Sequence, residues 1–66
     1  MTPQKPLLIP RLLSIAEVAR HLGVSKKTIR RLVEDGRLRS YRVRRQLRIS
    51  EEDLTAYLAH ARFVRE

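Results

Sequence analysis

Serine residues precede an amphipathic pattern at three points in the chain, and each one predicts the start of a helix. In each case an apolar residue precedes the serine and another follows it four residues later, at 13–18, 24–29 and 49–54. A serine at this position accepts a hydrogen bond from a backbone N–H of the first turn, and the flanking apolar residues pack together. Each such cap stabilises its helix by about 1 kcal/mol. Helices are therefore predicted after Ser14, Ser25 and Ser50.

Apolar residues recur every three or four positions after each serine, which is typical of helices with one buried face. The first helix is predicted from Ile15 to Leu22, the second from Ser25 to Gly36, and the third from Glu51 to about Phe63. The residues expected to be buried are Ile15, Val18, Ala19, Leu22, Ile29, Leu32, Val33, Leu54, Tyr57, Leu58 and Ala61.

Between the second and third helices the pattern changes to alternation, which predicts a two-stranded β-hairpin. Tyr41, Val43, Leu47 and Ile49 are expected to face the core, with arginines between them. The outer face is predicted to be almost entirely arginine, which is more positive charge than an edge strand needs to avoid pairing with other strands. These arginines therefore favour contact with DNA phosphates.

The first two helices are separated only by a short turn with Gly23, and the second helix is basic. This arrangement is typical of a helix-turn-helix. The fold predicted is mainly α with a small β-hairpin, a winged helix-turn-helix of order α-α-β-β-α. Residues 1–11, which contain all three prolines, are predicted to form a flexible N-terminal arm, and residues 12–66 the DNA-binding domain.

The amino-acid composition limits the classes of function that are compatible with this chain. The 66 residues include 15 Lys and Arg against 7 Asp and Glu, giving a net charge of +8, and such a basic small domain favours a nucleic-acid partner. Cysteine is absent, and His21 and His60 have no further ligand at metal-binding spacing, so we expect no metal, no cofactor and no enzymatic activity. The longest apolar run, from Leu7 to Ile9, is too short to span a membrane, and a cytoplasmic protein of a bacterial host without a membrane partner is expected.

Several segments together, 13–19, 22–25, 28–32 and 36–38 followed by the arginine-rich hairpin, resemble the excisionase family of MerR-like winged helix-turn-helix domains. The resemblance implies a recognition region made of Ser25, Lys26, Lys27, Thr28, Arg30 and Arg31, and a wing that includes Arg44, Arg45 and Gln46. It also implies action in integrase-mediated excision of a phage or mobile element, with DNA bending and contact with the integrase. This sequence has Arg44 where relatives usually have Gly and Leu47 where Trp is common, so a looser or longer wing tip is expected.

The favoured hypothesis is a sequence-preferring binder of double-stranded DNA, at an attachment site or a promoter. Lys27, Arg30 and Arg31 are expected to contact base edges, while Ser25, Lys26 and Thr28 contact phosphates. The wing residues assigned to DNA are Arg42, Arg44, Arg45, Gln46 and Arg48. An apolar patch of Ala56, Ala59 and Phe63 is either a frayed helix end or a contact between copies side by side on DNA.

Two alternatives remain open. A small transcriptional regulator would use the same residues in the same way. A protein-interaction adaptor would dock an acidic partner on the basic helix, but the segment from Ser25 to Arg37 lacks the aromatic anchors typical of such interfaces.

Overall fold

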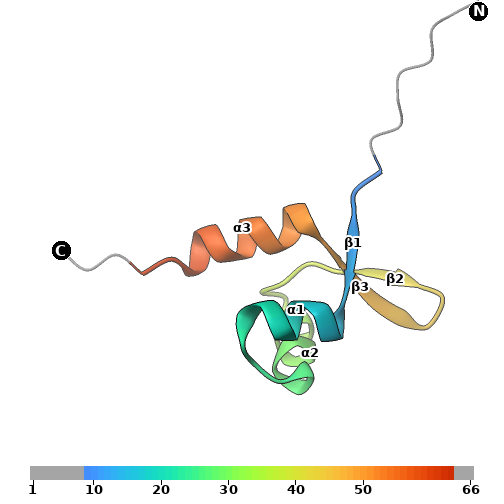
Figure 1. Ribbon diagram of the computed structural model, residues 1–66, viewed down its shortest axis with the longest axis horizontal. Coiled ribbons are helices and arrows are strands. Elements are labelled where there is room, and N and C mark those ends of the chain that lie inside the picture. The colour runs from blue at the N-terminus through green and yellow to red at the C-terminus, as the bar shows by residue number, and fades with distance from the viewer. Residues whose placement is uncertain (1–8, 64–66) are drawn as a thin grey trace, which may run out of the picture.

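The computed structural model describes residues 9–63, so residues 1–8 of the predicted arm lie outside the described part of the chain. Within it the elements are β1 (Leu12–Ser14), α1 (Ile15–Leu22), α2 (Lys26–Glu34), β2 (Tyr41–Val43), β3 (Gln46–Ser50) and α3 (Glu51–Ala61). Figure 1 shows α1 and α2 together below a small sheet, while the β2–β3 hairpin and α3 point to opposite sides. This is the winged helix-turn-helix architecture that the sequence predicted, with one additional strand.

All three predicted helix caps are confirmed. The hydroxyl oxygens of Ser14, Ser25 and Ser50 each accept the backbone N–H three residues later, at 3.0, 3.1 and 3.0 Å. Gly23 follows α1 in the left-handed region with φ 68°, a conformation that costs glycine little. These contacts are local in sequence, which explains why the helix starts were predicted correctly.

The cap of α1 also makes the domain sensitive to acid. The Ser14 backbone N–H donates to Glu17 Oε1 at 3.1 Å, completing a capping box. This hydrogen bond, the Ser14 hydroxyl and the nearby Arg11 and Arg20 hold the pKa of the Glu17 carboxyl below its ordinary value of 4.5. The carboxylate therefore contributes stability above about pH 4.5, and this contribution is lost as the pH falls through the lower folded-state pKa.

We expect Glu17→Gln to remove this part of the pH dependence, because the amide can still accept from Ser14 but does not titrate. The melting temperatures of wild type and variant, followed by circular dichroism, should differ more near pH 6 than near pH 3. A difference that stays constant with pH would contradict this assignment.

The short strand β1 was not predicted. It pairs antiparallel with β3, with Leu13 opposite Ile49, and the sheet order is β1-β3-β2. The backbone N–H of Glu51 also donates to the Arg11 carbonyl at 3.1 Å, one residue before the strand. Three residues are too few to show alternation, so only the partner strand reveals β1.

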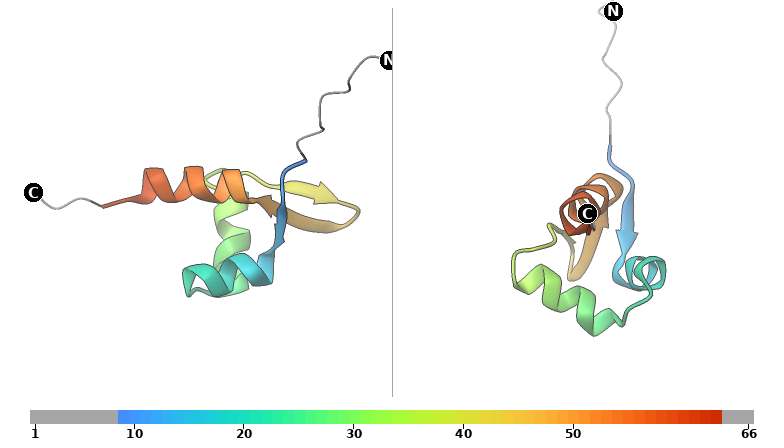
Figure 2. Two further views of the ribbon diagram at one scale, coloured as in Figure 1. Left: turned by 45° about the horizontal axis from the view of Figure 1, so that its top comes forward. Right: turned by 90° about the vertical axis from the view of Figure 1, so that its left-hand side faces the viewer.

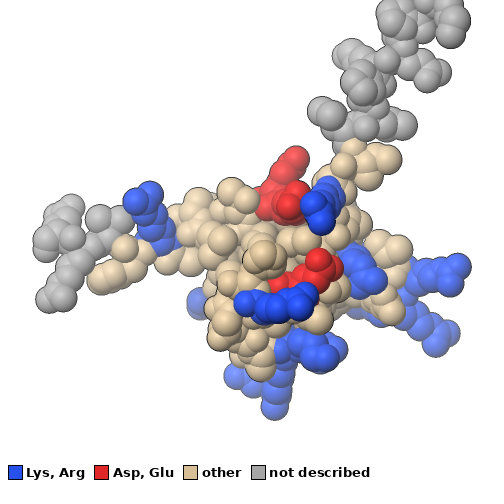
Figure 3. All heavy atoms as spheres, viewed as in Figure 1, with Lys and Arg blue, Asp and Glu red and all other residues tan. Residues whose placement is uncertain are grey.

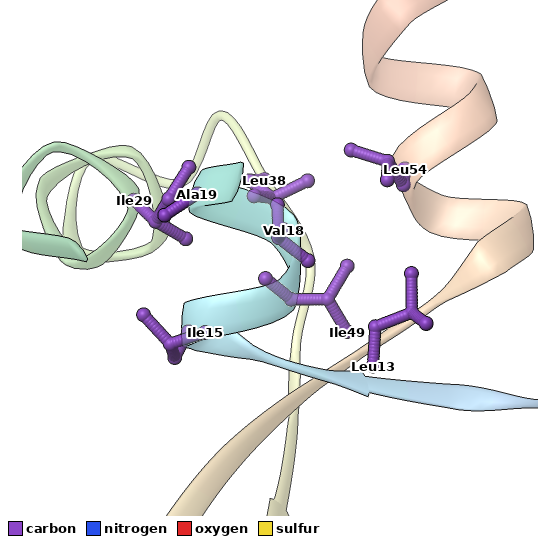
Figure 4. Close-up of a cluster of buried hydrophobic side chains, with 8 residues drawn as sticks. All are labelled: Leu13, Ile15, Val18, Ala19, Ile29, Leu38, Ile49 and Leu54. Atoms are coloured by element: carbon purple, nitrogen blue, oxygen red, sulfur yellow. The ribbon is translucent and has the colours of Figure 1, made fainter. Parts of the chain in front are cut away.

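The core lies where α1, α2, β1 and β3 meet. Figure 4 shows its side chains converging from these elements and from the start of α3. The buried apolar residues are Leu13, Ile15, Val18, Ala19, Ile29, Leu38, Ile49 and Leu54. Most of them were predicted from periodicity. Leu38, only 1% exposed, was not, because it lies in the irregular segment between α2 and β2.

The predicted inward face of the hairpin is wrong for its first strand. Tyr41 and Val43 are 47% and 48% exposed, whereas Leu47 and Ile49 pack into the core. Tyr41 pairs with Arg48, and Arg42 pairs with Leu47. Residues directly opposite in a pair share a face, so a two-residue turn places odd-numbered residues of β2 and β3 on opposite faces. The sequence prediction treated odd-numbered residues as inward-facing in both strands. With this two-residue turn, that rule is right for β3 and wrong for β2.

The wing tip is a tight two-residue turn, not the looser or longer loop expected. Val43 pairs with Gln46, which leaves only Arg44 and Arg45 in the turn. Arg44 adopts φ 59°, in the left-handed region that is unfavourable for a residue with a Cβ. The turn is therefore kept at the expense of backbone strain at Arg44.

Replacing Arg44 with glycine should raise the free energy of unfolding by about 0.5–1 kcal/mol, because glycine adopts this φ with little cost. Arg45→Gly removes the same charge without relieving strain, since Arg45 does not have a positive φ, and should be neutral or destabilising. Urea unfolding of both variants would check this. Equal stabilities for the two would show that the turn at Arg44 is unstrained.

The predicted buried stripe of the last helix is also only partly correct. Leu54 is buried and Tyr57 half-buried, but Leu58 is 45% exposed and Ala61 is exposed. The helix ends at Ala61, two residues before the predicted end. Figures 1 and 2 show the reason: α3 runs away from the sheet, so its later turns have no core to pack against.

Candidate nucleic-acid interface

The start of α2 is positively charged and exposed. Lys26 and Lys27 occupy its first turn, which contains no acidic residue, whereas the first turns of α1 and α3 both do. The Ser25 and Thr28 side chains hydrogen-bond to each other at 2.9 Å, and both residues are exposed. Free backbone N–H groups and the helix dipole favour an anion at this end. The start of α2 is therefore suited to contact a phosphate.

The two faces of α2 differ sharply in polarity. Ile29 is completely buried, and Leu32 and Val33 are packed partly into the core. Outside this buried stripe every basic residue assigned to the recognition helix is exposed: Lys26, Lys27, Arg30 and Arg31. Burial of the apolar stripe thus fixes the direction in which the cationic side chains project.

A concave surface lies between α2 and the hairpin, and we call it the basic groove. Its volume is about 480 Å³, and it is lined by Ser14, Ile15, Ala16, Lys26, Arg30, Arg42, Arg45, Gln46, Leu47 and Arg48. Five of these residues are cationic and none is acidic. The fold therefore brings charges from two separate parts of the chain onto one surface, where their attraction for a polyanion adds up.

The distribution of charge over the visible surface agrees with this. Figure 3 shows Lys and Arg side chains around the helices below the sheet and at the hairpin, while acidic side chains form one group at the top of the body and another near its middle, beside Lys and Arg side chains. The first turn of α3 contains Glu51, Glu52 and Asp53. These three carboxylates lie at a helix start, where they are stabilising, and none of them lines the basic groove.

The predicted site residues do not all line the groove. Lys26 and Arg30 are one turn apart on α2 and face the wing, whereas Lys27 and Arg31 lie on the next exposed stripe of the same helix. Arg44 projects from the wing tip and lines a different hollow together with Val43. The groove thus contains only part of the predicted recognition region.

The strand register places Arg42 on a different face of the hairpin from the one that the sequence pattern predicted. It lies opposite Leu47, on the face of the hairpin that turns toward the core and α2. It is nevertheless exposed, because the hairpin extends beyond the core at this point. The sequence pattern placed Arg42 on the outer face, and the structure places it in the groove. A DNA contact by Arg42 stays a prediction, now from the face of the hairpin that turns toward α2.

Two basic residues that were not predicted as site residues also lie on a concave surface. Arg37 and Arg39 follow α2 and, with residues of α3 that include Asp53 and His60, line a hollow of about 620 Å³. Both are exposed. Their position directly after a basic helix is the signal that would have drawn attention to them.

The predicted self-association patch is exposed but is not a continuous helical stripe. Ala56 and Ala59 are exposed on α3, and Phe63, 85% exposed, lies beyond the end of the helix. Ala56 also lines the hollow that contains Arg37. An association of copies through these residues stays a prediction.

No group of three or more His, Cys, Asp or Glu side chains in residues 9–63 is arranged to hold a metal ion. None of the helices in this range has the length and apolar character needed to cross a membrane.

Comparison with known proteins identifies the family. A family model described as a helix-turn-helix domain matches residues 12–62, nearly the whole described chain. The chain is also 49% identical over 49 residues to the uncharacterized protein YvgK of Bacillus subtilis (strain 168). The match covers 74% of this chain but 16% of YvgK, so the chain spans only a small part of that relative. No solved structure matches the chain significantly. By this match over residues 12–62, the chain belongs to the helix-turn-helix domain family of DNA-binding proteins.

Proposed function

We propose that the chain binds double-stranded DNA in a sequence-preferring manner, with α2 in the major groove and the β2–β3 wing on the adjacent strand backbone or minor groove. The observation that carries this proposal is the basic groove, in which α2 and the wing present five cationic residues together. A continuous surface of this kind contacts phosphates on both sides of a groove. In this arrangement Arg30 is directed at base edges and Arg45 at phosphates.

The biological role we propose is that of an excisionase, which bends attachment-site DNA and assists an integrase in excising a phage or mobile element. The winged architecture and the resemblance of the sequence to excisionases support this role. It is a non-enzymatic role, in which the protein shapes DNA for the recombinase. Cooperative binding would use the exposed Ala56, Ala59 and Phe63 as contacts between adjacent copies.

One observation favours a second candidate, a transcriptional regulator. The segment matched in YvgK is 16% of that protein, so in this relative a similar domain is joined to a much longer chain. A DNA-binding domain attached to a large second part is an arrangement that a regulator can use to couple binding of DNA to another event. Both candidates use the same groove, so the DNA complex distinguishes them by its size and shape.

Footprinting on duplex DNA from the region around the gene tests both the proposed DNA binding and the proposed biological role. Stepwise protection of direct repeats, with increasing bend in gel mobility, supports the excisionase role, and Phe63→Ser should then abolish the steps but not the first binding event. One fixed protected site with little bend supports a regulator. If neither is seen at low salt, DNA binding is wrong, and the basic surface is better explained by an acidic protein partner.

The salt dependence of DNA binding tests whether the basic groove contacts phosphates. Arg45→Ala should lower the slope of log K against log salt by about 0.9, the value for one lost phosphate contact, and should weaken binding to all sequences alike. His60→Ala, on α3 beside the other hollow, is a control that should leave the slope unchanged. An unchanged slope for Arg45→Ala would show that Arg45 of the wing does not contact a DNA phosphate.

A further inference from the structure

Arg48 is held against its own strand, unlike the other wing arginines. Its Nη2 donates to Gln46 Oε1 at 2.5 Å, and its Nη1 donates to the Leu47 carbonyl at 3.1 Å. Arg48 is half-buried, whereas Arg42, Arg44 and Arg45 are exposed. Two of its N–H donors are thus already used within the hairpin, which makes Arg48 the wing arginine least available to a phosphate.

The same contact determines which group Gln46 presents. A guanidinium group only donates hydrogen bonds, so the Gln46 atom that faces it must be the carbonyl oxygen. The amide NH2, on the other branch of the side chain, keeps both donors, and Gln46 is exposed at the end of the wing. Gln46 also lines the basic groove. Its NH2 group therefore offers a partner in the groove two donors, while its carbonyl oxygen is engaged by Arg48.

We propose that Arg48 is a positioning residue that fixes the amide of Gln46, so that the wing directs both N–H donors of this amide toward DNA. This inference rests on the proposed DNA-binding function and defines the chemistry that the wing recognises. The matching groups on DNA are acceptors, either phosphate oxygens or the N3 and O2 atoms at the minor-groove edge. The 2-amino group of guanine is a hydrogen-bond donor in the minor groove. It cannot accept from the Gln46 NH2 group and would repel it.

The test uses the site found by footprinting, with the base pairs beneath the wing changed to A·T, G·C or I·C. Inosine is guanine without the 2-amino group, so I·C has the minor groove of A·T and the major groove of G·C. Dissociation constants and salt slopes are measured for wild type, Gln46→Ala, Arg48→Met and the double variant. Methionine retains an apolar stem at position 48 but cannot donate a hydrogen bond.

If Arg48 acts through Gln46, each single variant should weaken binding to the A·T and I·C sites by about 3- to 10-fold, the effect of one hydrogen bond. The double variant should be no weaker than Gln46→Ala, and Arg48→Met should leave the salt slope unchanged. In wild type a preference for I·C over G·C that falls toward one in Arg48→Met identifies minor-groove acceptors as the partner. An equal loss on all three sites identifies phosphate oxygens.

Other results would overturn the proposal. If Arg48→Met lowers the salt slope by about 0.9 while Gln46→Ala has no effect, Arg48 contacts a phosphate directly. Additive losses in the double variant would show that the two residues act independently. If wild type binds none of the duplexes, the proposed function fails, which is distinct from either of these results.

Gln46→Glu provides a second variant that leaves Arg48 and its partner in place. Glutamate still accepts from Arg48 through a carboxylate oxygen, but it has no N–H to donate. It should weaken binding at least as much as Gln46→Ala, and binding equal to wild type would refute the role of the amide donors. Because Gln46 is exposed, this change should not disturb the fold, which a melting curve would verify.

Discussion

Ile29→Ala is expected to leave the domain largely unfolded at 25 °C. Ile29 is completely buried and is the only fully buried side chain that α2 contributes to the core among the described residues. Truncating a buried isoleucine to alanine costs about 2–5 kcal/mol, because apolar contacts are lost and a cavity remains. A domain of this size, without disulfides or metals, has a total stability of only about 3–5 kcal/mol.

Ile29→Val is the matched control. It removes one methylene and should cost about 0.5–1.5 kcal/mol, leaving the domain folded with a lower melting temperature. Far-UV circular dichroism and urea titrations of both variants measure the effect. If Ile29→Ala unfolds at nearly the same urea concentration as wild type, α2 does not pack on the core as the structure shows, and the direction of its basic face would have to be revised.

The second large effect is expected from Arg30→Ala in DNA binding. Arg30 is exposed and lines the basic groove one turn after Lys26, opposite the wing. In the proposed complex it lies in the major groove, where a guanidinium group forms two parallel hydrogen bonds to guanine O6 and N7. Loss of such a pair costs about 1–3 kcal/mol, so affinity for the preferred site should fall about 5- to 150-fold.

Arg30→Lys separates the charge from the geometry of the side chain. Lysine keeps the positive charge but cannot form the paired hydrogen bonds, so discrimination between bases should fall while the salt slope stays unchanged. Competition binding on duplexes that differ at one base pair measures both quantities. Arg31→Ala, on the adjacent stripe, should alter preference at a different base pair. If Arg30→Ala weakens all sequences equally, Arg30 contacts phosphate and not a base.

These two predictions concern a buried and an exposed residue of one helix, and they should be separable. Ile29→Val lowers stability without touching the groove, so its affinity, corrected for the fraction folded, should equal that of wild type. Arg30→Ala should leave the melting temperature nearly unchanged, because an exposed side chain on a helix contributes little to stability. Measuring both properties for both variants shows whether the core and the interface are independent.

Features that depend on residues close together in the chain were predicted well from the sequence. The caps at Ser14, Ser25 and Ser50 join groups only three residues apart, and α1 has the predicted bounds. The apolar stripe of α2 follows from the period of the helix, and so does the exposure of Arg30 on its other face.

Features that depend on a partner distant in the chain were predicted less well. The strand β1 exists because β3 lies beside it, and Leu38 is buried because other elements cover it. The faces of the hairpin follow from the length of its turn, which the apolar alternation does not contain. The exposure of Leu58 follows from the direction in which α3 leaves the sheet.

The sequence by itself therefore determined the winged helix-turn-helix class, the helix starts and the basic face of α2, because these arise from hydrogen bonds and periodicities within a few residues. Only the tertiary structure decided that Arg42 shares a groove with Lys26 and Arg30, and that Arg48 holds Gln46. The physical reason is that strand register and side-chain direction are set by packing between distant segments. The charge of the interface was predictable from the sequence, whereas its shape was not.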